Sequence, residues 1–328
     1  MPLWCRSLTA AALSGVLTDT IFAWVILMTT DAVRDIASRL SQSFHALAAL
    51  GLALQSRDMS GPPDPRLRSA IDGVIDSQGW RAALDAIAPG EIPPVLAAIR
   101  SDLLIGPKFA AGSSAPAPGW THTEDDLLQS FGAVSAGFPR LFRARFLPQM
   151  SGLSERLAMQ CASFLDIGTG VAALTIAMAR DWPDLRITAL EPHPAALALA
   201  RSNVAAADLD DRVVLHATRG EALEDVAAHD LVWIPSAFIP EPAVPEVIAR
   251  AARALKPGGW IIYAVVRPGS DSAADALARF RTAFWGGSLI GPEAVADLMA
   301  AAGLTEARLT DGPAHSTIGM MVARRPAQ

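Results

Sequence analysis

The spacing of hydrophobic and polar residues changes near residue 150. Before it, apolar residues recur at the three- and four-residue intervals of amphipathic helices, for example over residues 80–87 and 93–104. After it, short apolar runs bounded by turn residues alternate with stretches of helical spacing. Such alternation is typical of a doubly wound α/β sheet, in which a helix covers the sheet after each strand. We therefore predict a mainly α-helical domain over residues 1–150 and an α/β domain over residues 151–328.

The second half contains seven runs with the length and composition of strands. Five of them predict the main sheet, at residues 163–167, 185–190, 212–216, 231–235 and 260–266. Helical spacing is found at residues 172–180, 194–204, 272–284 and 292–302. The last two runs predict a closing strand pair at residues 306–310 and 316–323.

The N-terminal half contains an apolar run of eight residues at 21–28, bracketed by threonine and aspartate. A membrane-spanning helix needs about 20 predominantly apolar residues, so this run is too short to cross a bilayer. No pair of small residues typical of a signal-peptidase site follows it. We expect a helix that is buried in the core or in a dimer interface.

Residues 29–55 carry the pattern of two short helices and a strand. Residues 29–31 can cap a helix that ends at residue 40, and Ser41 can begin a second helix that ends near Gly51. Residues 51–55 look like a strand, so the order of elements predicts a winged-helix-like unit. The second helix is mainly apolar, whereas a DNA-reading helix carries polar and basic residues. Packing against protein is therefore favoured over contact with DNA.

Composition narrows the class of protein. With 328 residues, of which 51% are apolar and 18% charged, the chain is long enough for two globular domains. A net charge of −6 gives no support to broad binding of a phosphate backbone. Two cysteines are too few for a disulfide framework, and the six histidines lack the spacing of zinc ligands. We predict a cytoplasmic protein with no metal site and no nucleic-acid or membrane partner.

A glycine turn joins the first predicted strand to its helix at Gly168-Thr169-Gly170. Glycine has no Cβ and allows positive φ, so a ligand can come close to the backbone N–H groups there. The following helix points its positive N-terminal end at the same place. The turn predicts a site for a nucleotide-like or anionic group. With Ala173 it also fits the dinucleotide fingerprint G-x-G-x-x-G/A, so two ligand classes stay open at this point.

Four features in fixed order make residues 150–326 resemble the class I S-adenosylmethionine-dependent methyltransferases. They are Asp166 two residues before Gly168, Glu191 after the second strand, Gly220-Glu221 after the third, and the turn Lys256-Pro257-Gly258-Gly259 before the fifth. The closing strand pair resembles the reversed antiparallel hairpin of that family. The resemblance implies a Rossmann-like methyltransferase sheet and S-adenosylmethionine as the cofactor.

The same resemblance implies roles for individual residues. Glu191 would accept hydrogen bonds from both ribose hydroxyls, and Glu221 would face the adenine amino group. The implied cofactor-binding set is Asp166, Gly168, Thr169, Gly170, Glu191, Pro192, Gly220, Glu221 and Pro235.

The arrangement of the whole chain is similar to the two-domain small-molecule O-methyltransferases, which implies a homodimer formed through the N-terminal domain. Those enzymes usually carry a histidine base just after the fourth strand. Here the corresponding position falls at or beside Ala237, where the sequence has no histidine. This departure puts base-assisted O-methylation in doubt.

The predicted chemistry follows from the cofactor, whose sulfonium methyl group is already activated. In-line displacement then depends mainly on positioning, and a base is needed only if the acceptor must lose a proton. His315 and Ser236 are the candidate catalytic residues, and Trp120 and Trp285 are candidate apolar walls of an acceptor pocket. Trp120 ends a predicted loop, residues 108–120, which is either a lid or a solvated connector.

The sequence thus predicts methyl transfer to a small acceptor, of aromatic or polyketide type, as in secondary metabolism. Three alternatives stay open: a methyltransferase-fold enzyme that uses S-adenosylmethionine for another reaction, an NAD(P)-dependent oxidoreductase, and a DNA-binding regulator.

Overall fold

The computed structural model describes residues 10–58, 64–111, 119–267, 272–312 and 316–327, with side chains described from residue 31 onward except at 58, 109–111 and 272. The chain divides into two compact units, Met1–Ile87 and Ala88–Gln328. The boundary predicted near residue 150 lies inside the second unit, just before the sheet begins. As a division between functional domains it stays a prediction.

The described part of the first unit is helical. Its elements are α1 (Ala10–Asp58), α2 (Pro65–Ser77) and α3 (Arg81–Ala86). The prediction of a second helix from Ser41 and a strand at residues 51–55 is wrong, because α1 continues through both. Ser41 lies inside α1 and begins no new helix. Nearby, the Ser43 hydroxyl donates to the Arg39 carbonyl within α1, as a serine inside a helix can do. The winged-helix-like unit therefore lacks its strand among the described residues.

The apolar run at residues 21–28 lies within α1, and its side chains are outside the described part of the structure. Its predicted burial in a core or an interface stays a prediction. Among the described residues, no helix combines the length and the apolar character needed to cross a membrane.

The second unit begins with helices that precede the sheet. These are α4 (Ile92–Ala111), α5 (Asp125–Ser135), a run of short helical turns over residues 138–149, and α7 (Leu153–Leu157). The run at 138–149 consists of α6 (Phe138–Leu141), a π-helical turn and a 3₁₀ turn.

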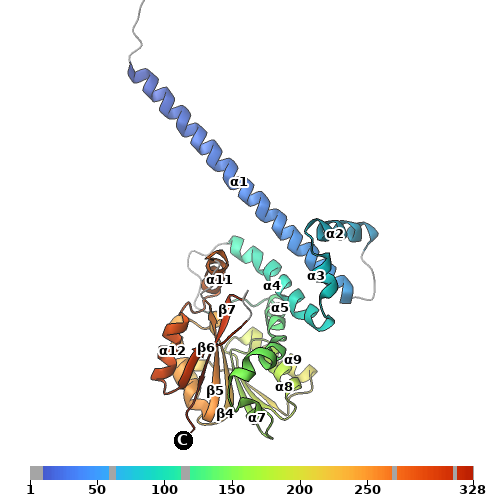
Figure 1. Ribbon diagram of the computed structural model, residues 1–328, viewed down its shortest axis with the longest axis vertical. Helices are drawn as coiled ribbons and strands as arrows, with labels where there is room; N and C mark the ends of the chain where they lie inside the picture. The colour runs from blue at the N-terminus through green and yellow to red at the C-terminus, as the bar shows by residue number, and fades with distance from the viewer. Residues whose placement is uncertain (1–9, 59–63, 112–118, 268–271, 313–315, 328) are drawn as a thin grey trace, which may run out of the picture. The chain divides into compact units, whose positions relative to one another are not determined.

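A seven-stranded sheet forms the centre of this unit, with helices on both of its faces (Figure 1). The strand order is β3-β2-β1-β4-β5-β7-β6, and only β7 runs antiparallel to its neighbours β5 and β6. The strands are β1 (Ser163–Ile167), β2 (Arg186–Leu190), β3 (Val213–His216), β4 (His229–Pro235), β5 (Leu255–Val266), β6 (Thr305–Leu309) and β7 (Ile318–Arg324). The doubly wound sheet and its closing antiparallel hairpin are confirmed.

The helices between the strands are α8 (Ala173–Asp181), α9 (Pro194–Ala206), α10 (Val244–Ala254), α11 (Ser272–Phe284) and α12 (Pro292–Ala301). The sequence pattern predicted all of them except α10.

Alternate residues of each central strand belong to two separate cores, because successive side chains of a strand point to opposite faces of the sheet. On β5, Trp260 and Ile262 pack with α8 and α9. Their neighbours Ile261 and Tyr263 pack with α10 and α12 on the other face. Burial on both faces explains why these strands read as continuous apolar runs.

An ion-pair network fixes the amino end of the sheet. Asp230 is buried at the start of β4 and accepts from Lys256 Nζ at 2.6 Å and Arg156 Nη1 at 2.7 Å. Its carboxylate also accepts from the backbone N–H of Ser163 at 2.9 Å. The lysine of the turn at residues 256–259 thus has a structural partner, and β1, β4 and β5 are joined at the end opposite to the glycine turn.

Candidate active site

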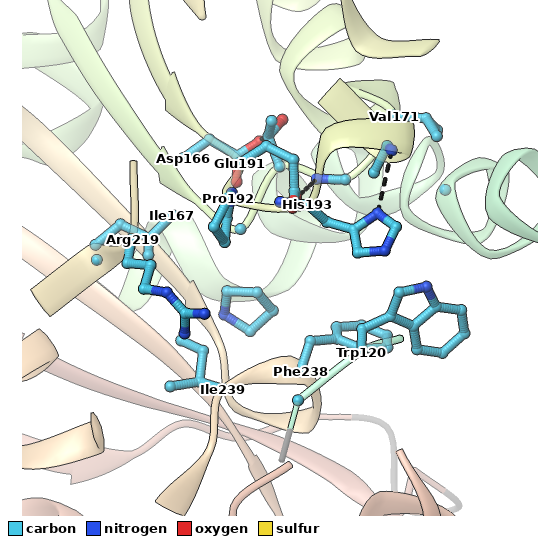
Figure 2. A pocket seen from close by; sticks show the side chains of 18 of the residues that line it. Trp120, Asp166, Ile167, Val171, Glu191, Pro192, His193, Arg219, Phe238 and Ile239 are labelled. Carbon is cyan, nitrogen blue, oxygen red and sulfur yellow. Dashed lines mark hydrogen bonds between the residues drawn. The ribbon is translucent and has the colours of Figure 1, made fainter. Parts of the chain in front are cut away.

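A cavity of about 440 Å³ lies at the carboxyl ends of β1, β2 and β4 (Figure 2). Open α/β sheets bind ligands at the carboxyl ends of the strands where the strand order reverses, and here it reverses between β1 and β4. One half of its wall comes from the strand ends, and the other half comes from α5 and two loop segments, residues 119–120 and 238–240. We refer to them as the strand-end half and the aromatic half.

The glycine turn forms the floor of the strand-end half. Gly168 and Gly170 have φ of +72° and +60°, which is the left-handed region that favours glycine. The N–H groups of Gly168 and Thr169 donate to the Leu190 carbonyl at 2.8 and 3.0 Å. These amides therefore hold the turn against β2, rather than lying open to a ligand as the sequence analysis assumed.

Glu191 is fixed from both sides. One carboxylate oxygen accepts from Gly170 N at 2.7 Å and the other from His193 N at 2.8 Å. Burial raises the pKa of Glu191, and the nearby Asp166 adds to this, while the two backbone hydrogen bonds act in the opposite direction. A carboxylate held in this way keeps its remaining lone pairs in one orientation at the cavity wall.

Asp166 is 1% exposed at the end of β1. Its Oδ2 atom accepts from the hydroxyls of Thr175 at 2.6 Å and Thr169 at 2.8 Å. Burial raises its pKa to about 6, although both threonines favour the ionised form. Asp166 thus holds the glycine turn through Thr169 and also contributes to the cavity wall.

The loop after β3 carries Arg219, Gly220 and Glu221, all of which line the cavity. A Cβ at Gly220 would lie 2.8 Å from Ile167 Cγ2, so only glycine lets this loop pack so closely on β1. The Arg219 and Glu221 side chains approach to 3.9 Å. They bring one positive and one negative charge to the same edge of the site.

Four aromatic rings pack edge to face or stack beside the cavity. Trp120 is 4.8 Å from Phe131, 5.3 Å from Phe238 and 6.2 Å from Trp285, measured between ring centroids. Trp120, Phe131 and Phe238 line the aromatic half. Trp285 is not part of the wall and lies behind it, stacked on Phe238 at 5.4 Å. The two predicted tryptophans are thus in one cluster, with different access to the cavity.

Close backbone contacts hold these rings together. The Gly119 N–H donates to the Gly286 carbonyl at 3.1 Å, and Ser288 N donates to Ser236 O at 3.1 Å. A Cβ at Gly287 would lie 2.1 Å from the carbonyl oxygen of Ala237. The segment after β4, including Ala237, is therefore covered by the backbone of residues 286–288.

Helix α5 is attached directly to the strand-end half. The side-chain amides of Gln129 and Asn203 exchange two hydrogen bonds, at 3.2 and 3.1 Å, and Asn203 also donates to the Val171 carbonyl at 2.9 Å. A Cβ at Gly132 would lie 2.1 Å from Val171 Cγ2. Helix α5 is therefore in contact with the glycine turn and with α9 at once.

All nine residues of the predicted cofactor set line the cavity. Their individual roles stay predictions. Of the predicted catalytic residues, Ser236 is buried and is not in the cavity wall. It lies near the hydroxyl of Tyr263, whose pKa burial raises to about 12 while Ser288 and Ser236 lower it. His315 is outside the described residues.

Several residues of the wall were not predicted from the sequence, among them Phe131, His193, Arg219, Phe238 and Ile239. His193 was detectable, because it directly precedes Pro194 at the start of α9, the position of a helix N-cap. Its Nδ1 accepts from Ala196 N at 3.4 Å. Phe131 had no such signal, since it belongs to a helix that precedes the sheet in the chain.

Comparison with known proteins agrees with this geometry. Residues 164–259 match a family model described as a methyltransferase domain. Over 146 residues the chain is 30% identical to a release factor glutamine methyltransferase of Gloeobacter violaceus, a match that covers 36% of this chain and about half (50%) of that relative. Residues 164–259 thus match the methyltransferases, the class of enzymes that take their methyl group from S-adenosylmethionine.

Solved structures with similar folds extend over most of the chain. An O-methyltransferase family protein from Burkholderia thailandensis is 18% identical with a TM-score of 0.57, over 90% of this chain and 98% of that one. The pyocyanin biosynthetic protein PhzM is 16% identical with a TM-score of 0.58, and the mitomycin 7-O-methyltransferase MmcR is 17% identical with a TM-score of 0.57. Both of these matches cover 92% of this chain and 99% of the other. At this identity the matches establish the fold.

Proposed function

We propose that the protein transfers a methyl group from S-adenosylmethionine to a small aromatic acceptor. The observation that carries the proposal is one cavity with two unlike halves. Buried carboxylates and a glycine turn form the strand-end half, and Trp120, Phe131 and Phe238 form the other. The fold shared with small-molecule methyltransferases supports the same conclusion.

The residues of the strand-end half fit a nucleoside that carries a cationic side chain. Glu191 offers a fixed carboxylate to ribose hydroxyls, and Glu221 offers an acceptor to an exocyclic amino group. Pro192 and Ile167 are apolar residues of the cavity wall, and Figure 2 shows them near Arg219. The adenine ring of a nucleoside can pack against them. When bound, the cofactor supplies an activated methyl group, and the protein contributes the alignment of donor and acceptor.

Calorimetric titration with S-adenosylmethionine, S-adenosylhomocysteine, NAD and NADP tests this proposal. We expect binding of the two sulfur nucleotides alone. Binding of a nicotinamide nucleotide instead would favour the oxidoreductase alternative and would overturn the proposed function. Salt-sensitive affinity for duplex DNA, measured in parallel, would favour the regulator.

The proposal includes a homodimer formed through the first unit. Four large apolar side chains of α1 are exposed at intervals of three, four and four residues, which places them on one side of the helix. They are Val33 (59%), Ile36 (49%), Leu40 (64%) and Phe44 (49%). A second copy of the chain can cover such a stripe.

A further inference from the structure

The strand-end half of the cavity carries more negative than positive charge. Three carboxylates line it, those of Asp166, Glu191 and Glu221, and among the described residues of the wall only Arg219 is always a cation. Arg219 and Glu221 approach each other to 3.9 Å, with 66% and 34% of their side chains exposed, so water screens this pair. Asp166 and Glu191 are buried, at 1% and 7% exposure. No lysine or arginine of the described chain pairs with either of them.

Two threonine hydroxyls hold Asp166 through one of its oxygens. The Oδ2 atom accepts from Thr169 at 2.8 Å and from Thr175 at 2.6 Å. Thr175 is fully buried on α8 and is not part of the cavity wall, whereas Asp166 is. Figure 2 shows Asp166 next to Glu191. The two buried carboxylates therefore face the same ligand.

An ionised carboxyl group is costly in these surroundings. Burial raises the pKa of Asp166 to about 6, although the two threonine hydrogen bonds lower it. Burial also raises the pKa of Glu191, and the charge of Asp166 raises it further. A positive charge that enters the cavity offsets this cost, because a nearby opposite charge favours the ionised form of a carboxyl group. By linkage, the ionised form of Asp166 in turn favours a cationic ligand.

We propose that Asp166 is a specificity-determining residue, whose ionised carboxylate favours the sulfonium of S-adenosylmethionine over the neutral thioether of S-adenosylhomocysteine. The two molecules share the adenosine part and the amino-acid part, so contacts to those parts contribute alike to both affinities. The sulfonium is the one formal charge that distinguishes them, and it is lost when the methyl group is transferred. Asp166 and Glu191 then lack a cation that offsets their charges, so the product is held less tightly than the donor.

This inference rests on the proposed function and names the residue that distinguishes the methyl donor from the spent cofactor. The preference for the donor should depend on pH, because Asp166 acts only when it is ionised. Below about pH 6, Asp166 gives up its proton to the solvent when the donor binds. Glu191, Glu221, Arg219 and His193 also face the cavity, from the loops after β2 and β3 and from the start of α9, whereas α8 and β4 contribute no ionisable residue to its wall. Replacing Asp166 alone therefore isolates its share.

Calorimetric titration of the wild type and of Asp166→Asn with both ligands tests this role, from about pH 4.5 to about pH 7.5, on either side of the raised pKa. Asparagine keeps an oxygen for the threonines and cannot ionise. For the wild type, we expect the ratio of the two dissociation constants to change about tenfold in favour of the donor as the pH rises, since a pKa lowered by about one unit corresponds to a factor of ten. In Asp166→Asn most of that change should be lost, with the affinity for S-adenosylhomocysteine within about threefold of the wild type.

Proton release gives an independent measurement. Repeating the titrations in buffers of different ionisation enthalpy counts the protons that leave the protein on binding. Just below the raised pKa of Asp166, we expect S-adenosylmethionine to release more protons from the wild type than S-adenosylhomocysteine does. In Asp166→Asn this difference should be largely absent.

Thr175→Val tests Asp166 without replacing it. Valine has a shape similar to threonine but no hydroxyl, so it removes the shorter of the two hydrogen bonds that favour the ionised carboxylate. We expect the preference for the donor to appear at a higher pH than in the wild type. Thr310→Val is the matched control, because Thr310 is also buried but its hydroxyl donates to the Met320 carbonyl beside β6, at the edge of the sheet.

Three results would overturn the role of Asp166. They are the same pH dependence for both ligands in the wild type, a ratio that changes with pH in Asp166→Asn as it does in the wild type, and an unshifted pH dependence in a folded Thr175→Val. Failure of the wild type to bind either ligand would instead contradict the proposed function.

Discussion

Glu191 places a carboxylate in the strand-end half and is held there by two backbone hydrogen bonds. Because both of its oxygens already accept backbone N–H groups, removing the side chain leaves two donors without partners in addition to the lost ligand contact. We expect Glu191→Ala to weaken the binding of S-adenosylmethionine by about a hundredfold or more, measured by calorimetry. Glu191→Gln keeps one acceptor oxygen, so its affinity for S-adenosylmethionine should lie between those of the wild type and Glu191→Ala. Retained affinity in a Glu191→Ala variant that is folded by circular dichroism would contradict the ribose assignment.

Asp166 makes the stability of the apo protein depend on pH in a direction that is unusual for a carboxyl group. Its folded-state pKa is raised from 3.8 to about 6, so its contribution is fully present below pH 3.8 and is lost as the pH rises through about 6. Asp166→Asn cannot ionise and can still accept from the threonines. Relative to the wild type, the variant should therefore gain on the order of 3 kcal/mol of unfolding free energy between pH 4 and pH 8.

Urea unfolding at a series of pH values measures this difference. Titrating groups distant from Asp166, including the buried His229, are common to both proteins and cancel. Glu191 does not cancel fully, because the charge of Asp166 contributes to its raised pKa. A difference that does not change with pH would show that Asp166 has an ordinary pKa in the folded protein.

At the residue scale, the sequence predicted the strand-end half better than the aromatic half. Gly168 and Glu191 follow strands directly and Glu221 lies in the loop after β3, so their places at the sheet edge follow from the order of elements. Phe131 reaches the cavity only because α5 packs on the glycine turn, a contact between segments about 40 residues apart in the chain. No local pattern encodes that contact.

At the scale of elements, the attachment of α5 is the feature that decides the shape of the cavity. A methyl group at Gly132 would overlap Val171, so we expect Gly132→Ala to displace α5, to lower stability by about 1–3 kcal/mol and to weaken binding of aromatic ligands. Gly106→Ala is the matched control on α4, where a Cβ meets nothing within 4 Å. It should be neutral or slightly stabilising. Equal effects of the two substitutions on binding would contradict a role for the close contact.

The bounds of helices and strands show where the local sequence pattern is sufficient to predict secondary structure. β1 and α11 have the predicted bounds because turn residues delimit buried or amphipathic runs there. The pattern at residues 41–55 predicted a helix from Ser41 and a strand from Gly51, but both residues lie inside α1. Glycine and serine in a helix cost roughly 1 kcal/mol or less, and tertiary packing overrides costs of that size.

At the scale of the whole molecule, the apolar stripe on α1 predicts the oligomeric state. We expect the wild type to be a dimer and Leu40→Asp to shift it toward monomer, because a charge would be buried in the interface. Ser38→Asp, on the opposite side of the same helix, is the control. Light scattering coupled to size-exclusion chromatography measures the mass across a range of concentrations. A wild type that is monomeric at every concentration would contradict the proposed interface.

The hydrogen bonds that join Asn203 to Gln129 and to the Val171 carbonyl also bear on how a ligand enters and leaves the cavity. Helix α5 cannot swing away to admit an acceptor without breaking contacts to the turn on which the cofactor rests. The opposite wall of the cavity consists of residues 119–120 and 238–240, which are joined by the ring contact of Trp120 with Phe238 and backed by the hydrogen bond from Gly119 N to Gly286 O. We therefore expect ligand exchange on the side of these loops to leave the contacts between α5 and the glycine turn intact.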